Sequence, residues 1–382
     1  MRLLHTSDWH LGKRLFKLER AQEQELYLDW LFKTIVEKEV DHLLICGDIF
    51  DTPTPPHFAQ EMYYDFLHRL SVHTECEVLI IAGNHDSGQL LEAPKKILKG
   101  HRISIWGKLS KNPDDHWLTL QKGAIALDVC AIPFFRSYEI LLENDQNSLD
   151  GLSRYFVKTS SNPKLLMLHH LAGITEGTGS EQVITLSGID CIPTDFLKQF
   201  DYVAMGHIHK PMKISNKIFY CGSPLPMRFS EKQSKEVRLI EIDQKGIFST
   251  SIEIPVFRKL HLLELNEDNW PSTIHQLPEE MGLRAVAEVK MSLSKPLSGI
   301  IDEIKKELEK KNIELLAYQP IYQQVEEKHQ KNEKIFQLSP IELFKEFYKS
   351  KYPEQGHVPD DLTLEFSELI QRVNDETHST QN

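Results

Sequence analysis

Several short apolar runs within the first 210 residues of the chain end in side chains that can bind metal ions. Asp8 and His10 follow the first run, and residues two apart in an extended segment face the same way, so both can reach one ion. The later runs end in the same residue types, namely Asp48, Asn84, the adjacent pair His169 and His170, and the pair His207 and His209. Taken singly, an aspartate after a strand is often a helix cap, and Gly-Asn-His-Asp is a plausible turn. Because Asp, Asn and His recur at the end of one apolar run after another, these side chains together predict a metal centre.

The donor types indicate which ions would bind and what they would do. Carboxylate, imidazole and amide donors without thiolate suit manganese, iron or zinc, whereas a magnesium-only site would favour oxygen ligands. The roughly seven candidates exceed the four to six ligands that fill one ion, so we expect two ions. Asp48 is the natural bridge, because a carboxylate can give one oxygen to each metal. Ions about 3.5–4 Å apart would clamp a phosphoryl displacement and acidify the attacking water, which predicts a metal-dependent phosphoesterase.

The candidate ligands need strands and helices to position them, and the pattern of apolar residues predicts such elements. Five runs are typical of buried strands: residues 3–6, 42–46, 78–82, 165–168 and 202–205. Helix patterns at residues 25–37 and 58–69 separate the early runs, which favours a largely parallel sheet covered by helices. Since ligands collect at the carboxyl ends of such strands, we expect all five to deliver their side chains to one edge of one sheet. Further runs predict a second sheet packed on the first, at residues 124–132, 218–221, 237–242 and 250–254.

The composition changes after Pro255. Strand patterns at residues 260–265, 284–291 and 313–318, with a helix pattern at 297–311, predict a small α+β unit. Ser339-Pro340-Ile341-Glu342 is typical of a helix start, and apolar stripes through Phe344 and through Leu362, Phe366, Leu369 and Val373 predict two tail helices. The expected fold is α/β, a two-sheet sandwich flanked by helices, with a small α+β capping domain and a helical C-terminal tail. The expected boundaries are 1–257, 258–323, 324–336 for a charged linker, and 337–376.

Bulk properties limit the class of protein. No apolar run is long enough to span a bilayer and the N-terminus is too polar for a secretory signal, so we expect a cytoplasmic protein. The five cysteines are scattered without a Cys-x-x-Cys pair, which argues against disulfides or a thiolate zinc site. The formal net charge of −12 speaks against a free-standing nucleic-acid binder. The charge is uneven, however, and the basic run at residues 94–111 is either a solvated face or a phosphate-steering patch.

The motifs themselves resemble a known family. Asp-x-His, Gly-Asp, Gly-Asn-His-Asp, His and Gly-His-x-His, in that order, resemble the calcineurin-like metallophosphoesterase superfamily. HTSDWHLGK, CGDIFD, IAGNHD, VAMGHIHKP and YCGSPLP, spread over residues 5–226, are similar to its SbcD branch, the nuclease subunits of bacterial SbcCD complexes. This resemblance implies a dinuclear-metal DNA nuclease, with double-strand exonuclease and single-strand or hairpin endonuclease activity in DNA end processing, repair and recombination. It also implies two divalent ions, most readily Mn²⁺.

The resemblance also implies a role for each matching residue. Asp8, His10 and His209 would hold the first ion, Asn84, His169 and His207 the second, and Asp48 would bridge them. His85 would orient or protonate groups at the scissile phosphate, with Asp86 nearby to partner it. Only one of His169 and His170 can point at the metals from a strand end. We prefer His169, because it directly follows the apolar run.

The tail resembles the helical segment that binds SbcC, the coiled-coil ATPase partner. The implied assembly is a heterotetramer of two SbcC and two SbcD subunits acting on double-stranded and hairpin DNA. The chain has no Gly-x-x-x-x-Gly-Lys-[Ser/Thr] motif, so ATP hydrolysis is expected of the partner alone. The alternative for the tail is that its apolar stripes fold back onto the body.

Two rival functions remain open at this point. A small-substrate phosphatase or phosphodiesterase could use the same two-ion centre, since a superfamily fixes chemistry better than substrate. The chain beyond residue 255 argues against it, because such an enzyme would not need that part. A non-catalytic scaffold with vestigial ligands is disfavoured, because every ligand position holds a competent side chain.

Overall fold

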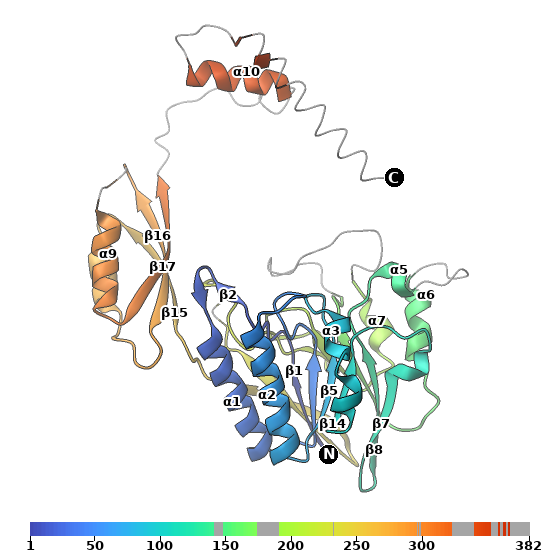
Figure 1. The fold of residues 1–382 in the computed structure, drawn as a ribbon. Coiled ribbons are helices and arrows are strands. Elements are labelled where there is room, and N and C mark those ends of the chain that lie inside the picture. Colours follow the sequence, from blue (N-terminus) through green and yellow to red (C-terminus); the bar gives the residue numbers. More distant parts are fainter. Residues whose placement is uncertain are drawn as a thin grey trace. The chain divides into compact units, whose positions relative to one another are not determined.

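The computed structural model describes most of the chain in two compact units, residues 1–321 and 322–382. The described residues are 1–140, 148–173, 191–231, 233–295, 297, 299–322, 340–352, 358–359, 362–363 and 366. The predicted linker at 324–336 lies outside them, as do Ser339 and the end of the second tail stripe. The first unit contains two stacked sheets with helices on their outer faces, followed by a smaller three-stranded sheet (Figure 1).

The first large sheet contains the strands that follow the N-terminus. Its order is β14 (Gly246–Glu253), β13 (Glu236–Asp243), β1 (Arg2–Thr6), β4 (His42–Cys46), β5 (Glu77–Ile81) and β6 (Ile103–Trp106). β1, β4, β5 and β6 are parallel, and β13 is antiparallel to β1. Every residue of β4 is buried, because the strand has covered neighbours on both faces.

Helices cover the outer face of this sheet. α1 (Ala21–Glu37) and α2 (His57–His73) bury one apolar face each against it, through residues such as Leu31 and Phe66. Three further short elements lie before and after β6: α3 (Gly88–Glu92), α4 (Lys95–Lys99) and the 3₁₀ turn η1 (Pro113–His116). A small hairpin of β2 (Arg14–Leu15) and β3 (Leu18–Glu19) precedes α1.

The second large sheet packs on the inner face of the first. Its order is β11 (Met212–Lys213), β12 (Ile218–Tyr220), β10 (Tyr202–Gly206), β9 (Lys164–His169), β8 (Ile125–Ile132) and β7 (Trp117–Lys122). The two sheets share a core that includes Leu44 and Met167. The outer face packs on short helical elements: α5 (Ser137–Ile140), α6 (Ser148–Ser153), η2 (Arg154–Phe156) and α7 (Thr194–Leu197). The predicted two-sheet sandwich flanked by helices is confirmed.

The distribution of strands between the sheets corrects the sequence-based expectation. β9 and β10 were expected beside β1, β4 and β5, but they belong to the second sheet. β13 and β14 were expected in the second sheet, but they extend the first. A strand that is buried on both faces has no alternation of polar and apolar residues, so its sequence does not identify its neighbour. The prediction of one sheet edge was therefore wrong, and two edges meet instead.

The α+β region follows residue 257. It contains β15 (Leu260–Asn266), α8 (Trp270–Gln276), β16 (Ala285–Leu293), α9 (Ile300–Glu309) and β17 (Ile313–Tyr322). β15 and β16 pair in parallel, and α9 packs Ile304 and Leu308 onto the sheet. The predicted helix and strands are present, whereas α8 was not foreseen. In the second unit, α10 (Pro340–Lys351) carries Phe344, whose ring stacks on Phe366 with centroids 4.2 Å apart.

No helix among the described residues is long and apolar enough to cross a membrane.

Acid should destabilise the two-sheet core through His5, which β1 places between the sheets. Its Nε2 lies 3.2 Å from the carbonyl oxygen of Met205, and burial, with Arg238 nearby, lowers the pKa of His5 to about 3. The unfolded state therefore binds more protons than the folded state between pH 6.5 and 3, so stability falls as the pH falls through this window. Between pH 7 and 5 this one group should remove about 2 kcal/mol. Urea unfolding with a chelator present should show that loss in the wild type and a smaller one in His5→Gln; equal losses would contradict the assignment.

Candidate metal centre

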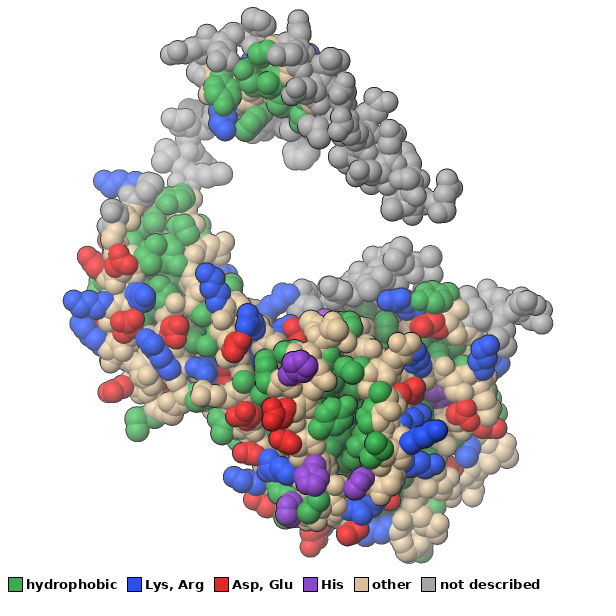
Figure 2. Space-filling model, viewed as in Figure 1, with side chains coloured by type: hydrophobic (Ala, Val, Ile, Leu, Met, Phe, Trp, Pro, Cys, Tyr) green, Lys and Arg blue, Asp and Glu red, His purple; other side chains and the backbone are tan. Residues whose placement is uncertain are grey.

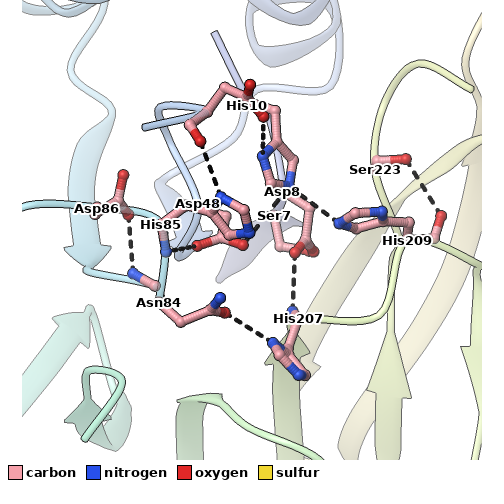
Figure 3. Close-up of polar contacts among 12 residues, drawn as sticks. Ser7, Asp8, His10, Asp48, Asn84, His85, Asp86, His207, His209 and Ser223 are labelled. Carbon is pink, nitrogen blue, oxygen red and sulfur yellow. Dashed lines mark hydrogen bonds and ion pairs between the residues drawn. The ribbon is translucent and has the colours of Figure 1, made fainter. Parts of the chain in front are cut away.

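The carboxyl ends of strands from both sheets meet at one end of the sandwich. β1 and β4 end there in the first sheet, and β9 and β10 end there in the second. The structure brings together the seven predicted ligand side chains: Asp8, His10, Asp48, Asn84, His169, His207 and His209. Figure 3 shows most of them converging from different loops.

Two glycines of the motifs allow this close approach. A Cβ on Gly206, at the end of β10, would clash with the carbonyl oxygen of Cys46 in β4. A Cβ on Gly83 would clash with the carboxylate of Asp48. Glycine is therefore required at Gly206, where the two sheets approach each other, and at Gly83, where the loops after β4 and β5 meet.

The backbone at the ligands is held in an uncommon conformation. Asp8, His10, Asp48 and His207 all have positive φ angles, of 54°, 46°, 50° and 99°. Non-glycine residues rarely adopt this region, which costs about 1–3 kcal/mol each and is concentrated at functional sites. The surrounding fold therefore holds these turns in place, and the turns direct the side chains inward.

The first group of donors is buried and tightly packed. Asp8, His10, Asp48 and His209 each offer an atom within 4.8 Å of the others. The Nε2 atoms of His10 and His209 face each other at 3.0 Å, and Nε2 of His10 lies 3.6 Å from Oδ2 of Asp48. Asp8 is oriented by two donors, the Ser7 hydroxyl and the backbone N–H of His207 at 2.9 Å from Oδ1.

A second group of donors also reaches Asp48. Oδ1 of Asn84 lies 2.9 Å from Nδ1 of His207 and 3.1 Å from Nε2 of His169. The same His169 nitrogen is 3.4 Å from Oδ2 of Asp48. Oδ2 of Asp48 is therefore close to a donor of each group, His10 of the first and His169 of the second.

The two adjacent histidines after β9 point to different surroundings. Nδ1 of His169 lies 2.8 Å from the carbonyl oxygen of Cys46 and donates to it, so Nε2 is directed at the cluster. His170 instead packs between Phe134 and Phe135, and its Nε2 accepts the backbone N–H of Phe135 at 3.3 Å. The structure thus brings His169, and not His170, to the other candidates.

The electrostatics of the cluster favour cations. Burial lowers the pKa of His169, but the Asp48 carboxylate outweighs this and raises the pKa to about 9. Burial raises the pKa of Asp48, but His169 and His10 outweigh it and lower the pKa. Burial raises the pKa of Asp8 to about 6, and burial together with His10 lowers the pKa of His209 to about 2. Asp48 thus attracts positive charge while His209 stays neutral, and these nitrogen and oxygen donors fit divalent ions.

His85 lies at the edge of this cluster and is only partly buried. Its Nδ1 lies 2.9 Å from the carbonyl oxygen of Asp51, and its backbone N–H donates to Oδ1 of Asp48 at 2.8 Å. With Nδ1 donating to a carbonyl, Nε2 remains for other partners. The ring stands edge-on to His10, with centroids 4.9 Å apart.

The structure places the Asp86 carboxylate against backbone N–H groups instead of against His85. Oδ2 accepts from Gly83 at 2.8 Å and from Ile49 at 3.2 Å, and Oδ1 accepts from Phe50 at 3.0 Å. Burial and the nearby Asp48 raise the pKa of Asp86. These contacts tie the loop after β4 to the loop after β5, and the carbonyl of Asp51 takes the place beside His85 that was expected for Asp86.

Sequence reasoning missed two charged residues of the site. Asp51 lies with Oδ1 at 3.2 Å from Nδ1 of His10, without hydrogen-bond alignment, and at 2.7 Å from the Lys13 ammonium. The buried ammonium of Lys235 donates to the carbonyl oxygen of His209 at 2.9 Å and to Oγ of Ser223 at 3.1 Å. Asp51 could have been found from its position three residues after Asp48, whereas nothing in the local sequence connects Lys235 to His209.

Comparisons with known proteins give the family of this arrangement. The calcineurin-like phosphoesterase family matches residues 1–211, and the family described as type 5 capsule protein repressor C-terminal domain matches residues 256–352. The chain is 27% identical to the D subunit of the SbcCD nuclease of Escherichia coli strain K12 over 286 residues, which cover 69% of this chain and 71% of the relative. It is 28% identical to the protein of the same name from Bacillus subtilis strain 168, over 98% of this chain and 99% of the relative. With the buried cluster, the first match indicates a dinuclear metal site.

Proposed function

The chain belongs to the calcineurin-like phosphoesterase family, and on that premise we propose that it is a dinuclear-metal DNA nuclease, the nuclease subunit of an SbcCD-type complex. The observation that carries the proposal is the position of the Asp48 carboxylate, 3.6 Å from His10 and 3.4 Å from His169. Each of the two groups of nitrogen and oxygen donors has one histidine close to it. A relative that matches nearly the whole chain bears the name of a nuclease subunit.

We assign the ligands from these two groups. Asp8, His10 and His209 would hold the first ion, Asn84, His169 and His207 would hold the second, and Asp48 would contact both. The contacts at 3.0 Å between His10 and His209 and at 2.9 Å between Asn84 and His207 support the grouping. Manganese is the proposed metal, because the mixture of imidazole and oxygen donors suits it better than magnesium.

The chain's own residues prepare the reaction. Two divalent ions would supply Lewis-acid activation of water and neutralise phosphate charge. Ser7 and the His207 backbone orient Asp8, and the Cys46 carbonyl fixes the tautomer of His169. The Asp51 carbonyl does the same for His85, so that its Nε2 can donate a proton or a hydrogen bond at the scissile phosphate.

The substrate is the part of the proposal that most needs a test. The purified chain with Mn²⁺ should degrade linear duplex DNA, and this should be compared with turnover of a small chromogenic phosphodiester. The C-terminal match at residues 256–352 favours DNA, because a small-substrate phosphodiesterase would not need this part. Turnover of the small compound with no attack on duplex, hairpin or single-stranded DNA would favour a small-substrate phosphodiesterase instead.

We further propose that residues 337–376 bind the coiled-coil ATPase SbcC, in a cytoplasmic heterotetramer of two subunits of each kind. The amphipathic pattern of α10 and the names of the relatives support this. The boundaries 1–257 for the nuclease domain and 258–323 for a DNA-binding cap belong to the same proposal. The separate core of the α+β region, with Ile304 and Leu308 at its centre, supports the second boundary.

Deleting the tail should separate partner binding from cleavage. A chain that ends at residue 336 should lose co-purification with the ATPase, because it lacks the apolar stripes that would dock on it. Its basal Mn²⁺-dependent nuclease activity should stay within about twofold of the wild type, because the metal centre lies within residues 1–321. Truncation after residue 376 is the matched control and should change neither property. Retained binding by the shorter chain would place the interface elsewhere.

A further inference from the structure

A groove of about 410 Å³ lies between the β2–β3 hairpin, the segment that follows β12 and the sheet of the α+β region. The hairpin contributes Arg14 and Phe16, the segment contributes Arg228 and Phe229, and β16 contributes Glu288 and Lys290. None of these residues belongs to the proposed metal centre. The volume falls within the usual range for ligand sites, about 300–1,000 Å³.

Phe16 is the unusual residue of this groove. It occupies the tip of the hairpin with 58% of its surface exposed and a φ angle of 53°. A bulky residue at positive φ is a conformational outlier, and Gly or Asn would form the same turn with less strain. One side of the ring is supported by the buried Phe229, with centroids 6.1 Å apart. The conformation of the turn therefore gives no reason for a phenylalanine at this position. The Phe16 ring packs on Phe229 with one side and remains accessible to a ligand.

The side chains of the groove carry a small excess of positive charge. Arg14 forms an ion pair with Glu19 of the same hairpin. With that pair set aside, the groove has two cations, Arg228 and Lys290, and one acidic side chain, Glu288. The whole chain carries a net charge of −12, and basic and acidic side chains are interspersed on the face shown in Figure 2. A local excess of cations in such a chain raises the concentration of negatively charged ligands there.

Both walls of the groove are connected to the metal centre. On one side, the Lys13 backbone N–H donates to the carbonyl oxygen of His10 at 2.9 Å, and the six residue steps from His10 to Phe16 span at most about 22 Å. On the other, the Ser223 backbone N–H donates to the carbonyl oxygen of His209 at 3.1 Å, four residues before Met227.

A buried ion network holds the walls together. Arg20, which follows the hairpin, donates to the carbonyl oxygen of Pro226 at 2.6 Å and to Glu23 at 2.6 Å. Glu23 also accepts from Arg258 at 2.8 Å, at the start of the α+β region. All three charged residues are buried, so the groove is fixed before any ligand arrives.

We propose that this groove holds an unpaired strand of the DNA substrate, with one base stacked on Phe16 and the backbone phosphates near Arg228 and Lys290. The inference rests on the proposed nuclease function and assigns to it a binding site for an unpaired strand. Aromatic platforms beside cations are how proteins bind single strands without reading sequence. A base inside a duplex has neighbours on both faces, so it cannot stack on Phe16 without leaving the helix.

The test compares single-stranded and duplex DNA on the full chain, with a chelator present to prevent cleavage. Phe16→Asn keeps a residue that tolerates the turn and removes the ring. It should weaken binding of a fluorescent 15-nucleotide oligothymidine about 5- to 150-fold, which corresponds to about 1–3 kcal/mol per stacked base, and binding of a blunt duplex less than twofold. Phe16→Trp should bind both like the wild type. Phe248→Asn, an exposed aromatic on β14 that does not line the groove, is the matched control and should change neither affinity.

A second readout does not depend on mutant stability. An oligonucleotide carrying 2-aminopurine should lose fluorescence when it binds the wild type and Phe16→Trp, and should keep it with Phe16→Asn. Equal losses of single-strand and duplex affinity, or unchanged affinity in Phe16→Asn, would overturn the inference. If the wild type neither binds nor cleaves any DNA, the proposed nuclease function fails instead, and the two failures are distinguishable.

Discussion

Replacing Asp48 with asparagine should lower Mn²⁺-dependent phosphodiester cleavage about 1,000-fold or more and remove at least one bound ion. The carboxylate is close to a donor of each group, so its loss should weaken both halves of the centre at once. A factor of 1,000 corresponds to about 4 kcal/mol of transition-state stabilisation, which is within the several kcal/mol expected of metal ions. Initial rates on linear duplex DNA and the manganese content of the purified variant measure the two effects.

The asparagine variant is chosen because it should still fold. The amide oxygen can accept the His85 backbone N–H as Oδ1 of Asp48 does, and the substitution removes a negative charge close to Asp8 and Asp86. Asp29→Asn is the matched control, because Asp29 forms only a partly exposed ion pair with Arg69 on the outer helices. The assignment of Asp48 as the bridge would be wrong if Asp48→Asn kept two ions and wild-type rates.

His85→Ala should keep both ions and lose about 100- to 10,000-fold of the cleavage rate. The Nδ1 of His85 is bound to the Asp51 carbonyl, and its ring lies beside His10 without forming part of the buried donor groups on either side of Asp48. A side chain that transfers or shares a proton at the reacting group contributes a factor of this size. Cleavage assays paired with metal analysis on the same preparation separate the two roles.

The metal content of His85→Ala distinguishes a catalytic role of His85 from a role as a metal ligand. Loss of manganese together with activity would show that His85 is a ligand, and the close group of His10, Asp51 and His85 would then be the place to look for that ion. His57→Ala replaces an exposed histidine at the start of α2 and should leave cleavage and metal content unchanged. Wild-type cleavage by His85→Ala would remove the residue from the reaction altogether.

Much of the fold could be predicted because buried strands have a strong sequence signal. His42–Cys46 was predicted with its observed bounds, and the ends of β9 and β10 were predicted within one residue. The pairing of strands could not be predicted, because a fully apolar run fits either sheet equally well. The β2–β3 hairpin was missed for a different reason, since strands of two residues have no periodicity to detect.

In the candidate site, too, local sequence patterns could be predicted and contacts between distant parts of the chain could not. The seven candidate ligands could be chosen from sequence because each lies within four residues of the end of an apolar run, and His169 was preferred over His170 because it directly follows its run. The surroundings of Asp86 and Lys235 could not be inferred in this way. Their contacts join loops that are far apart in the chain, such as Lys235 with His209 and Asp86 with Phe50. In the basic run at residues 94–111, at least one side chain has a structural role. Arg102 donates to the carbonyl oxygens of Ser71 and Thr74.

The two-ion centre is the central claim, and locating manganese in the folded protein tests it most directly. Anomalous diffraction at the manganese edge, from crystals grown with MnCl₂, should show two peaks about 3.5–4 Å apart on either side of the Asp48 carboxylate. One peak should lie beside His10 and His209, and the other beside Asn84 and His169. A single peak, no peak, or two ions that do not share Asp48 would contradict the account.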